Sequence, residues 1–425
     1  MEDDGSTPRV RLISTHQSLT DFQDNVSSLW CPQSVPIIDG KLSSLEFCRE
    51  YVSCSRPVIF RTMESSESTM CKVDQSHIET KKWTMPRWTV EDIESLCCGS
   101  NIQMTVNVTP DGHGDVIRTV SVREEDTDTE IRKEQVFLLP EERIMGLEEF
   151  VTAMRQQVLP NSNNLELDDI GLPILKATYS TDSPGTLKID ATNDSKNLVY
   201  YYSLQNDCLR TEFPELLDHL QPITHDFISW AEEAFGIKGP DAMNLWIGNQ
   251  QATSSLHKDY YENLFYVASG EKVFTLYPPS DAAILPTLTV PSLRFHQTST
   301  TCNSRYNATD CISHGNDHTT ESNSWMCFLD QESTDEISTP WIYLPSSNFK
   351  YQQYLHPLTV HLHAGEILYL PAMWFHEVSQ TTETVAINWW FDMQYQSPLY
   401  CYFQLLEGCH LETVQSDQEA DSKKR

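Results

Sequence analysis

Residues 254–274, SSLHKDYYENLFYVASGEKVF, decide the fold and carry the first candidate site residues. Side chains two positions apart on a strand point to the same face, so the pattern places His257 beside Asp259 and turns Lys258 away. A histidine nitrogen and a carboxylate oxygen on one face form half of a divalent-metal site. The motif alone is weak, because a His-x-Asp pair also arises by chance and then forms a surface hydrogen bond.

A third metal ligand is expected in residues 365–380, GEILYLPAMWFHEVSQ. His376 lies there in a predicted strand that begins after a proline and a run of large apolar residues. Two histidines and one carboxylate leave three coordination positions open, the arrangement of non-haem iron(II) oxygenases. The sequence therefore predicts a metal site of His257, Asp259 and His376.

Lys272 begins the next predicted strand and shares a face with Phe274 and Leu276. A lysine on an apolar, inward face is costly unless an anion meets it. We interpret its ammonium group as the anchor for one carboxylate of a dicarboxylic cosubstrate. The alternative is a lysine at the end of a strand whose side chain reaches water.

The composition limits the partners. Of 425 residues, 61 are Asp or Glu and 29 are Lys or Arg, so the net charge is −32. This charge argues against a nucleic-acid partner, which needs a basic face, and fits a basic peptide, although acidity also simply confers solubility. No apolar run approaches a membrane span, no signal peptide is recognised, and none of the twelve cysteines forms a C-x-x-C pair. A cytoplasmic protein is expected, with the nucleus as a second compartment and no membrane partner.

The second half of the chain has the pattern of a jelly roll. Residues 263–270 and 272–278 alternate as strands around a Ser-Gly turn and predict a hairpin, and further short strands follow in residues 358–391. The first half predicts helices in residues 43–52, 89–97 and 146–158, the first two capped by Ser43 or Ser44 and by Thr89. Two separate helices are expected in residues 213–220 and 224–236.

Three polar segments are expected to lack regular structure. These are a charged loop at residues 123–134, a connector up to residue 196, and an insert rich in Ser, Thr and Asn. The insert contains two cysteines and two histidines in an unfamiliar spacing, for which a disordered loop is a better interpretation than a zinc site. They are Cys302, Cys311, His314 and His318.

Residues 255–281, 364–378 and 385–393 together resemble the JmjC oxygenases, the jumonji branch of the cupin superfamily. The spacing Gly365-x5-Pro371-x4-His376 is similar to the second cupin motif. Further blocks between residues 35 and 407 resemble the lysyl hydroxylases of this family, to which a second, peptidase activity has been ascribed. The resemblance implies an α+β fold: a double-stranded β-helix core (jelly-roll, cupin, JmjC) with N-terminal helices and a C-terminal helix.

The implied organisation has four parts. Residues 1–34 form a helical or flexible N-terminal segment, and residues 35–196 an α+β elaboration packed on the barrel. Residues 197–407 form the JmjC barrel with a disordered insert at 296–335, and a disordered tail covers residues 408–425.

The resemblance also implies roles for individual residues. Fe(II) would be held by the three predicted metal ligands, with 2-oxoglutarate and dioxygen as cosubstrates. Lys272 would bind the distal carboxylate of 2-oxoglutarate, helped by hydrogen bonds from Tyr201 and from Ser254, which stands where threonine is expected. Asn263 and Asn388 resemble pocket-lining residues, although ordinary backbone hydrogen bonding would also explain them.

The implied activity is hydroxylation of a protein lysine at its C3 position, giving the (3S) product, with developmentally regulated GTP-binding proteins as the first candidate substrates. Three alternatives remain. A histone lysine demethylase would use the same iron chemistry, a peptidase would cleave methylated histone tails, and a binding module would have no activity. The apolar stripe of the predicted helix at residues 399–407 either supports a homodimer or packs on its own domain.

Overall fold

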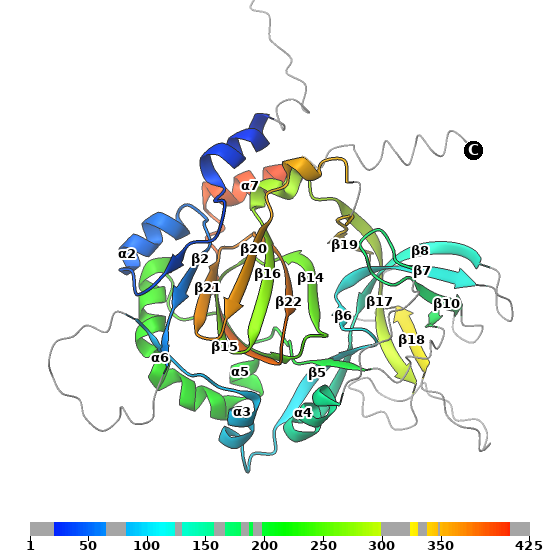
Figure 1. The fold of residues 1–425 in the computed structure, drawn as a ribbon, viewed down its shortest axis with the longest axis horizontal. Helices are drawn as coiled ribbons and strands as arrows, with labels where there is room; N and C mark the ends of the chain where they lie inside the picture. Colours follow the sequence, from blue (N-terminus) through cyan, green and yellow to red (C-terminus); the bar gives the residue numbers. More distant parts are fainter. Residues whose placement is uncertain are drawn as a thin grey trace, which may run out of the picture.

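Two facing sheets form the jelly-roll core (Figure 1). The computed structural model describes residues 21–64, 82–123, 130–156, 166–179, 187–189, 198–298, 324–329, 338–346 and 349–408. The larger sheet has the order β1 (Ile37–Ile38), β2 (Val58–Arg61), β21 (Glu366–Leu370), β15 (Tyr261–Ser269), β23 (Thr384–Asp392) and β13 (Ala242–Gly248). The facing sheet has the order β20 (Leu358–His363), β16 (Glu271–Tyr277), β22 (Phe375–Gln380), β14 (Thr253–Lys258) and β6 (His113–Gly114).

The inner faces of the two sheets pack through one apolar cluster. Its members include Trp246, Phe265, Phe274, Leu368 and Trp374, all less than 9% exposed. The burial of these large apolar side chains is the main source of the free energy that holds the two sheets together. The cluster fixes which face of β14, β16 and β22 looks into the barrel, and that face carries the candidate site.

The predicted hairpin at the Ser-Gly turn is wrong. β15 pairs with β21 and β23, whereas β16 pairs with β20 and β22, so the turn carries the chain from one sheet to the other. Gly270 has a φ of 80°, and a Cβ there would lie 2.4 Å from the carbonyl oxygen of Glu383. Glycine is therefore required at this crossing.

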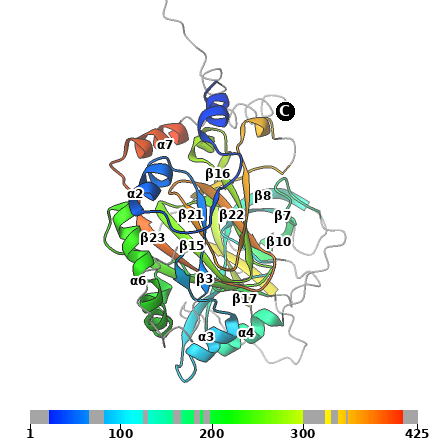
Figure 2. The same cartoon turned by 60° about the vertical axis from the view of Figure 1, so that its left-hand side comes forward.

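Helices cover the outer face of the larger sheet (Figure 2). The helix bounds are α2 (Ser44–Phe47), α3 (Val90–Leu96), α4 (Leu147–Arg155), α5 (Cys208–Thr211), α6 (Pro214–Phe235) and α7 (Pro398–Gly408). Ser43 and Thr89 form capping boxes with Glu46 and Asp92, which confirms both predicted helix starts. A π-helical turn, Cys48–Val52, continues α2, and another, Val26–Trp30, precedes it.

α6 replaces the two separate helices that the sequence predicted. It runs through Pro222, which cannot donate the usual helical hydrogen bond. The apolar face remains in phase on both sides of this proline, because Leu216, Leu220, Phe227 and Ala231 are all buried. Continuous burial of one face therefore outweighs the local cost of the proline. Among the described residues no helix is long and apolar enough to cross a membrane.

A second large sheet overturns the three predictions of irregular structure. Its order is β18 (Ser324–Leu329), β11 (Leu187–Ile189), β10 (Leu175–Tyr179), β7 (Val116–Arg123), β8 (Glu130–Leu139), β17 (Thr287–Thr298) and β19 (Ser338–Ile342). Strands thus occupy parts of residues 123–134, of the connector and of the insert at 296–335. The polar composition of these segments did not predict strands. A sheet with one solvated face, however, needs apolar residues on the other face only. The four residues of the doubtful zinc site lie outside the described residues.

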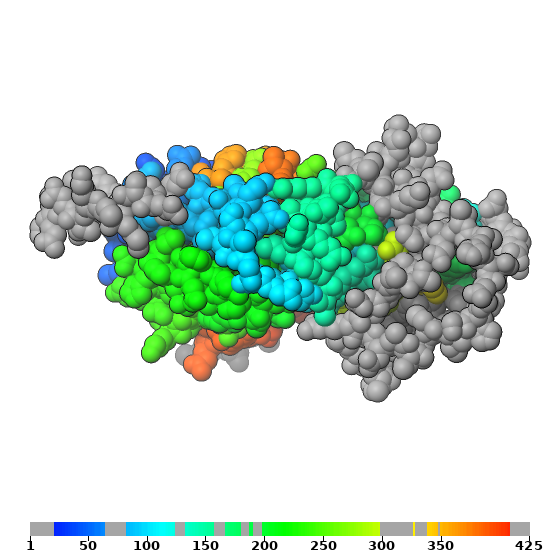
Figure 3. All heavy atoms as spheres, turned by 90° about the horizontal axis from the view of Figure 1, so that it is seen from below, coloured from blue at the N-terminus to red at the C-terminus, as the bar shows by residue number. Residues whose placement is uncertain are grey.

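A smaller sheet contacts β13 of the jelly-roll core and β17 of the seven-stranded sheet, near the candidate site. It consists of β12 (Val199–Tyr201), β5 (Gln103–Thr109) and β9 (Glu141–Gly146), and the pair β3 (Met63–Glu64) and β4 (Thr84–Met85) lies near α6. Short 3-10 helices span Pro279–Ala283 and Gln352–Tyr354. Figure 3 shows α3 in blue and α4 in teal, together covering one face beside the green segment that contains α6.

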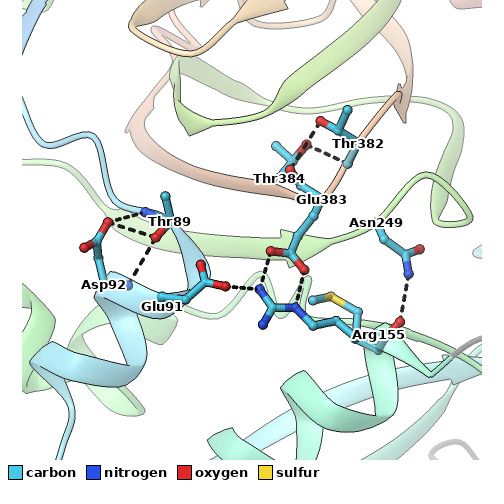
Figure 4. Close-up of polar contacts among 9 residues, drawn as sticks. Thr89, Glu91, Asp92, Arg155, Asn249, Thr382, Glu383 and Thr384 are labelled. Atoms are coloured by element: carbon cyan, nitrogen blue, oxygen red, sulfur yellow. Dashed lines mark hydrogen bonds and ion pairs between the residues drawn. The ribbon is translucent and has the colours of Figure 1, made fainter.

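An arginine links this helical layer to the turn after β22 (Figure 4). At the end of α4, Arg155 donates to both carboxylate oxygens of Glu383 at 2.6 and 2.7 Å and to Glu91 of α3 at 2.6 Å. In the same place the side chain of Asn249 donates to the carbonyl oxygen of Met154 at 2.9 Å. These contacts hold α3 and α4 against the strand end that carries Gln380.

Candidate metal centre and cosubstrate pocket

The three predicted metal ligands lie together inside the barrel. His257 of β14 and His376 of β22 are direct cross-strand partners. One ligand atom from each of His257, Asp259 and His376 lies within 4.8 Å of the others, and His376 Nε2 is 3.5 Å from Asp259 Oδ2. Such a group of two nitrogens and one carboxylate oxygen fits a divalent transition metal with open positions.

Asp259 reaches this group by a route that strand alternation did not predict. β14 ends at Lys258, so Asp259 is the first residue beyond the strand, and the register of β14 is irregular before His257. The carbonyl oxygen of Asp259 accepts a hydrogen bond of 2.8 Å from the backbone of Met373. This bond ties the end of β14 to the loop before β22.

Backbone carbonyl groups orient both histidine rings. Nδ1 of His257 lies 2.6 Å from the carbonyl oxygen of Ser255, and Nδ1 of His376 lies 3.0 Å from that of Trp374. A carbonyl oxygen only accepts, so each Nδ1 carries the proton and donates it. Each Nε2 is then left with its lone pair toward the centre, the tautomer that binds a metal.

Burial and mutual charge favour the metal-binding protonation states. Burial lowers the pKa of His257, and the neighbouring His376 lowers it further, against the opposite effect of Asp259. Burial alone would raise the pKa of Asp259, but the electrostatic interaction of its carboxylate with the His376 and His257 rings outweighs burial, so that this pKa lies below its ordinary value. A neutral imidazole beside an ionised carboxylate is what a metal ion requires.

Lys272 ends inside the same pocket and does not reach water. Its side chain is buried, and its Nζ donates to Tyr201 Oη at 3.0 Å and to Gln380 Oε1 at 2.9 Å. Burial lowers the pKa of Lys272 to about 7. Neither of its partners carries a formal charge, so an anionic carboxylate would complete the environment of the ammonium group.

Sequence reasoning missed Gln380. It pairs across the sheet with Lys272, and its Nε2 donates to the carbonyl oxygen of Asn249 at 2.6 Å. The signal was available, because Gln380 lies four positions after His376 on the same face of β22. The backbone of Gly248 also comes close here, since a Cβ at that position would lie 2.6 Å from both Gln380 Nε2 and the Tyr201 ring.

The remaining predicted residues divide into two groups. Tyr201 and Ser254 both line the pocket. Asn263 also lines it and accepts a hydrogen bond of 3.1 Å from Asn388. Asn388 is fully buried behind it and accepts a bond of 2.9 Å from Trp246 Nε1, so it positions neighbours and does not face the pocket.

A cavity of about 300 Å³ lies outside the centre and shares His257, Asp259 and Tyr201 with the inner pocket. Trp246 and Trp341 form apolar walls, and the smaller sheet supplies polar ones. This volume is enough for an amino-acid side chain. The arrangement therefore offers a metal centre, an inner anion site and an outer space for a substrate. The donor set fits iron(II), and the buried cation fits a dicarboxylate such as 2-oxoglutarate.

Comparisons with known proteins agree with this geometry. The family model described as Cupin-like domain matches residues 43–397. The human bifunctional peptidase and (3S)-lysyl hydroxylase JMJD7 is 30% identical over 93% of this chain and 96% of its own length. JmjC domain-containing protein E of Dictyostelium discoideum is 28% identical over 91% and 90%, and the lysine-specific demethylase JMJ32 of Arabidopsis thaliana is 36% identical over 53% and 61%. The chain therefore belongs to the cupin-like JmjC family, whose relatives include hydroxylases and demethylases.

Proposed function

We propose that the protein is an Fe(II)- and 2-oxoglutarate-dependent dioxygenase that hydroxylates a lysyl side chain of another protein. One observation carries the proposal: His257, Asp259 and His376 share a pocket with the buried ammonium group of Lys272. The three ligands alone would fit many metal proteins. The buried cation in the same pocket fits a dicarboxylic cosubstrate and hence an oxygenase.

Different residues of the site have different roles in the proposed reaction. When bound, iron with 2-oxoglutarate and dioxygen supplies the oxidising power for C–H hydroxylation, with succinate and carbon dioxide as coproducts. Lys272 and Tyr201 bind the far carboxylate of the cosubstrate and thereby set its position. The two fixed imidazole rings present Nε2 toward the metal, and the outer cavity places the substrate side chain over the centre.

A lysine substrate is supported from two sides. The human relative is named as a (3S)-lysyl hydroxylase, and the net charge of −32 favours a basic partner. Within this proposal, developmentally regulated GTP-binding proteins are the first substrates to test, and the cytoplasm, with the nucleus second, is the proposed compartment.

We also propose a homodimer through α7, because Leu399 and Leu405 on that helix are 39% and 62% exposed. A monomer in analytical ultracentrifugation would contradict the homodimer.

The names of two relatives support two alternative activities for this protein. The Arabidopsis relative is named as a lysine-specific demethylase, and demethylation would use the same centre on an N-methyl group of a histone lysine. The human relative is also named as a peptidase, an activity that on methylated histone tails would need no 2-oxoglutarate. The pocket around Lys272 favours the oxygenase over the peptidase.

The decisive experiment reconstitutes the protein with Fe(II) without oxygen, and then adds 2-oxoglutarate, oxygen and a lysine-containing peptide from a GTP-binding protein. Mass spectrometry should find a gain of one oxygen atom on the lysine, together with stoichiometric succinate. Asp259→Ala, which removes a ligand, should abolish both. Loss of a methyl group from a methylated peptide with release of formaldehyde would assign a demethylase. Cleavage without 2-oxoglutarate would assign a peptidase.

A further inference from the structure

Asp115 lies in the wall of the outer cavity, which also contains His257 and Asp259. It occupies the turn between β6 and β7 with a φ of 52°, a left-handed conformation that aspartate tolerates better than most residues. Uncommon backbone conformations of this kind persist where the surroundings enforce them. The sequence offered no signal for this residue.

A chain of hydrogen bonds ties Asp115 to the strand that carries the metal centre. Trp341 Nε1 donates to Ser255 Oγ at 3.1 Å, and Ser255 Oγ in turn donates to the carbonyl oxygen of Asp115. The Trp341 ring lies nearly parallel to that of His257, with 11° between the planes and 6.2 Å between the centroids. The position of Asp115 is therefore coupled to that of the metal ligand His257.

The carboxylate of Asp115 lacks a partner of its own. In the part of the chain that the structure describes, no hydrogen bond or ion pair reaches this carboxylate. Burial raises the pKa of Asp115 to about 6 because the charge of Arg294 offsets it only in part, and Glu142 acts in the same direction as burial. Arg294 itself donates to the carbonyl oxygen of Pro140 at 3.0 Å and to Glu142 at 3.4 Å.

The lysine in the cavity wall is engaged by a residue outside the cavity. Lys258 lines the cavity, but its Nζ pairs with Glu407 of α7 and lies over the Phe375 ring. The cavity thus presents an ionisable, poorly compensated carboxylate between aromatic walls. A ligand with an apolar stem and a cationic end matches this combination, because the stem covers the rings and the cation meets the carboxylate.

We propose that Asp115 binds the ammonium group of the substrate lysine. It thereby selects for a side chain that has an apolar stem and a cationic end. Trp246 and Trp341 then flank the methylene groups of that lysine, which brings its C–H bonds beside the metal centre. This inference rests on the proposed lysyl hydroxylase function and assigns the residue that recognises its substrate. Acylation of the lysine would remove the charge that Asp115 requires.

Binding can be tested without turnover. The protein is loaded with Fe(II) and 2-oxoglutarate under nitrogen, and calorimetry measures a Gly/Ser-flanked peptide with one free lysine against the same peptide with Nε-acetyllysine. The parent protein should bind the free lysine at least about tenfold more tightly, the ratio expected for one charge-assisted hydrogen bond. Asp115→Asn, which tolerates the same backbone conformation, should abolish this ratio.

Asp226→Asn is the matched control, because it removes one negative charge at a side chain on α6 that is 87% exposed and outside the cavity wall. It should retain the full preference for the free lysine. Equal binding of the two peptides to the parent protein, including no binding of either, would overturn the inference, as would an unchanged preference in a folded Asp115→Asn variant. If the parent shows the preference but hydroxylates no lysine peptide, the proposed function fails while the recognition by Asp115 stands.

Discussion

Replacing Lys272 with methionine should stabilise the cosubstrate-free protein and abolish 2-oxoglutarate binding. Burial lowers the pKa of Lys272 from 10.5 to about 7, and this shift corresponds to about 4–5 kcal/mol of differential free energy. Near pH 7 the folded protein bears almost all of this cost, because the unfolded chain keeps the proton up to about pH 10.5. Leaving Gln380 Oε1 without its donor costs about 1–2 kcal/mol. The expected net stabilisation is about 2–4 kcal/mol.

The same substitution removes the only charged partner that we assign to the far carboxylate. Losing one member of a buried, hydrogen-bonded charge pair costs about 2–5 kcal/mol, so affinity for 2-oxoglutarate should fall at least about thirtyfold. Urea unfolding at pH 7 measures the stability, and anaerobic calorimetry with Fe(II) measures the affinity. Lys238→Met, an exposed lysine changed in the same way, should alter neither. A Lys272→Met variant that is less stable than the parent, or that keeps its affinity, would refute this reasoning.

Further predictions address the centre, its cosubstrate and the helical layer. Asp259→Ala should abolish tight Fe(II) binding in anaerobic titrations but leave circular dichroism unchanged; retained binding would remove it from the ligand set. Gly248→Ala places a Cβ 2.6 Å from the Tyr201 ring, so 2-oxoglutarate affinity measured by calorimetry should fall, and an unchanged value would contradict the crowding. Above pH 7 the dissociation constant of 2-oxoglutarate should rise by up to about tenfold per pH unit, because free Lys272 then loses the proton that binding needs, whereas a flat profile would place its pKa elsewhere. Thr89→Ala should lower the free energy of unfolding, measured in urea, by about 1 kcal/mol because it breaks the α3 capping box. An unchanged free energy of unfolding would show that this cap does not stabilise the protein.

Much of the site could be predicted because it lies on strands of a buried barrel. Alternation along β16 placed Lys272 on the inward face, and Phe274 and Leu276 of that strand are indeed buried with it. Short-range signals were equally direct at the helix starts, where Ser43 and Thr89 satisfy backbone groups within their own turn. In each case the information lies within a few residues of sequence.

The failures lie where distant segments decide the outcome. The alternation argument placed Asp259 on the strand, but β14 ends one residue earlier, and the loop before β22 holds the aspartate in place. A Ser-Gly turn looks the same whether the chain returns in one sheet or crosses to another, as it does at Gly270. Asp115 belongs to the cavity only because β6 lies beside β14, a parallel pairing of residues about 140 positions apart.

The central claim is that one pocket holds both the metal and 2-oxoglutarate, and visible absorption under nitrogen tests it most directly. Adding Fe(II) and then 2-oxoglutarate should produce a charge-transfer band that needs both components, appears at one equivalent of each and disappears in His376→Ala. Because the band arises only when the keto acid chelates the metal, it reports the shared site without any turnover. Binding of Fe(II) without such a band, or a band that survives the loss of His376, would contradict the account.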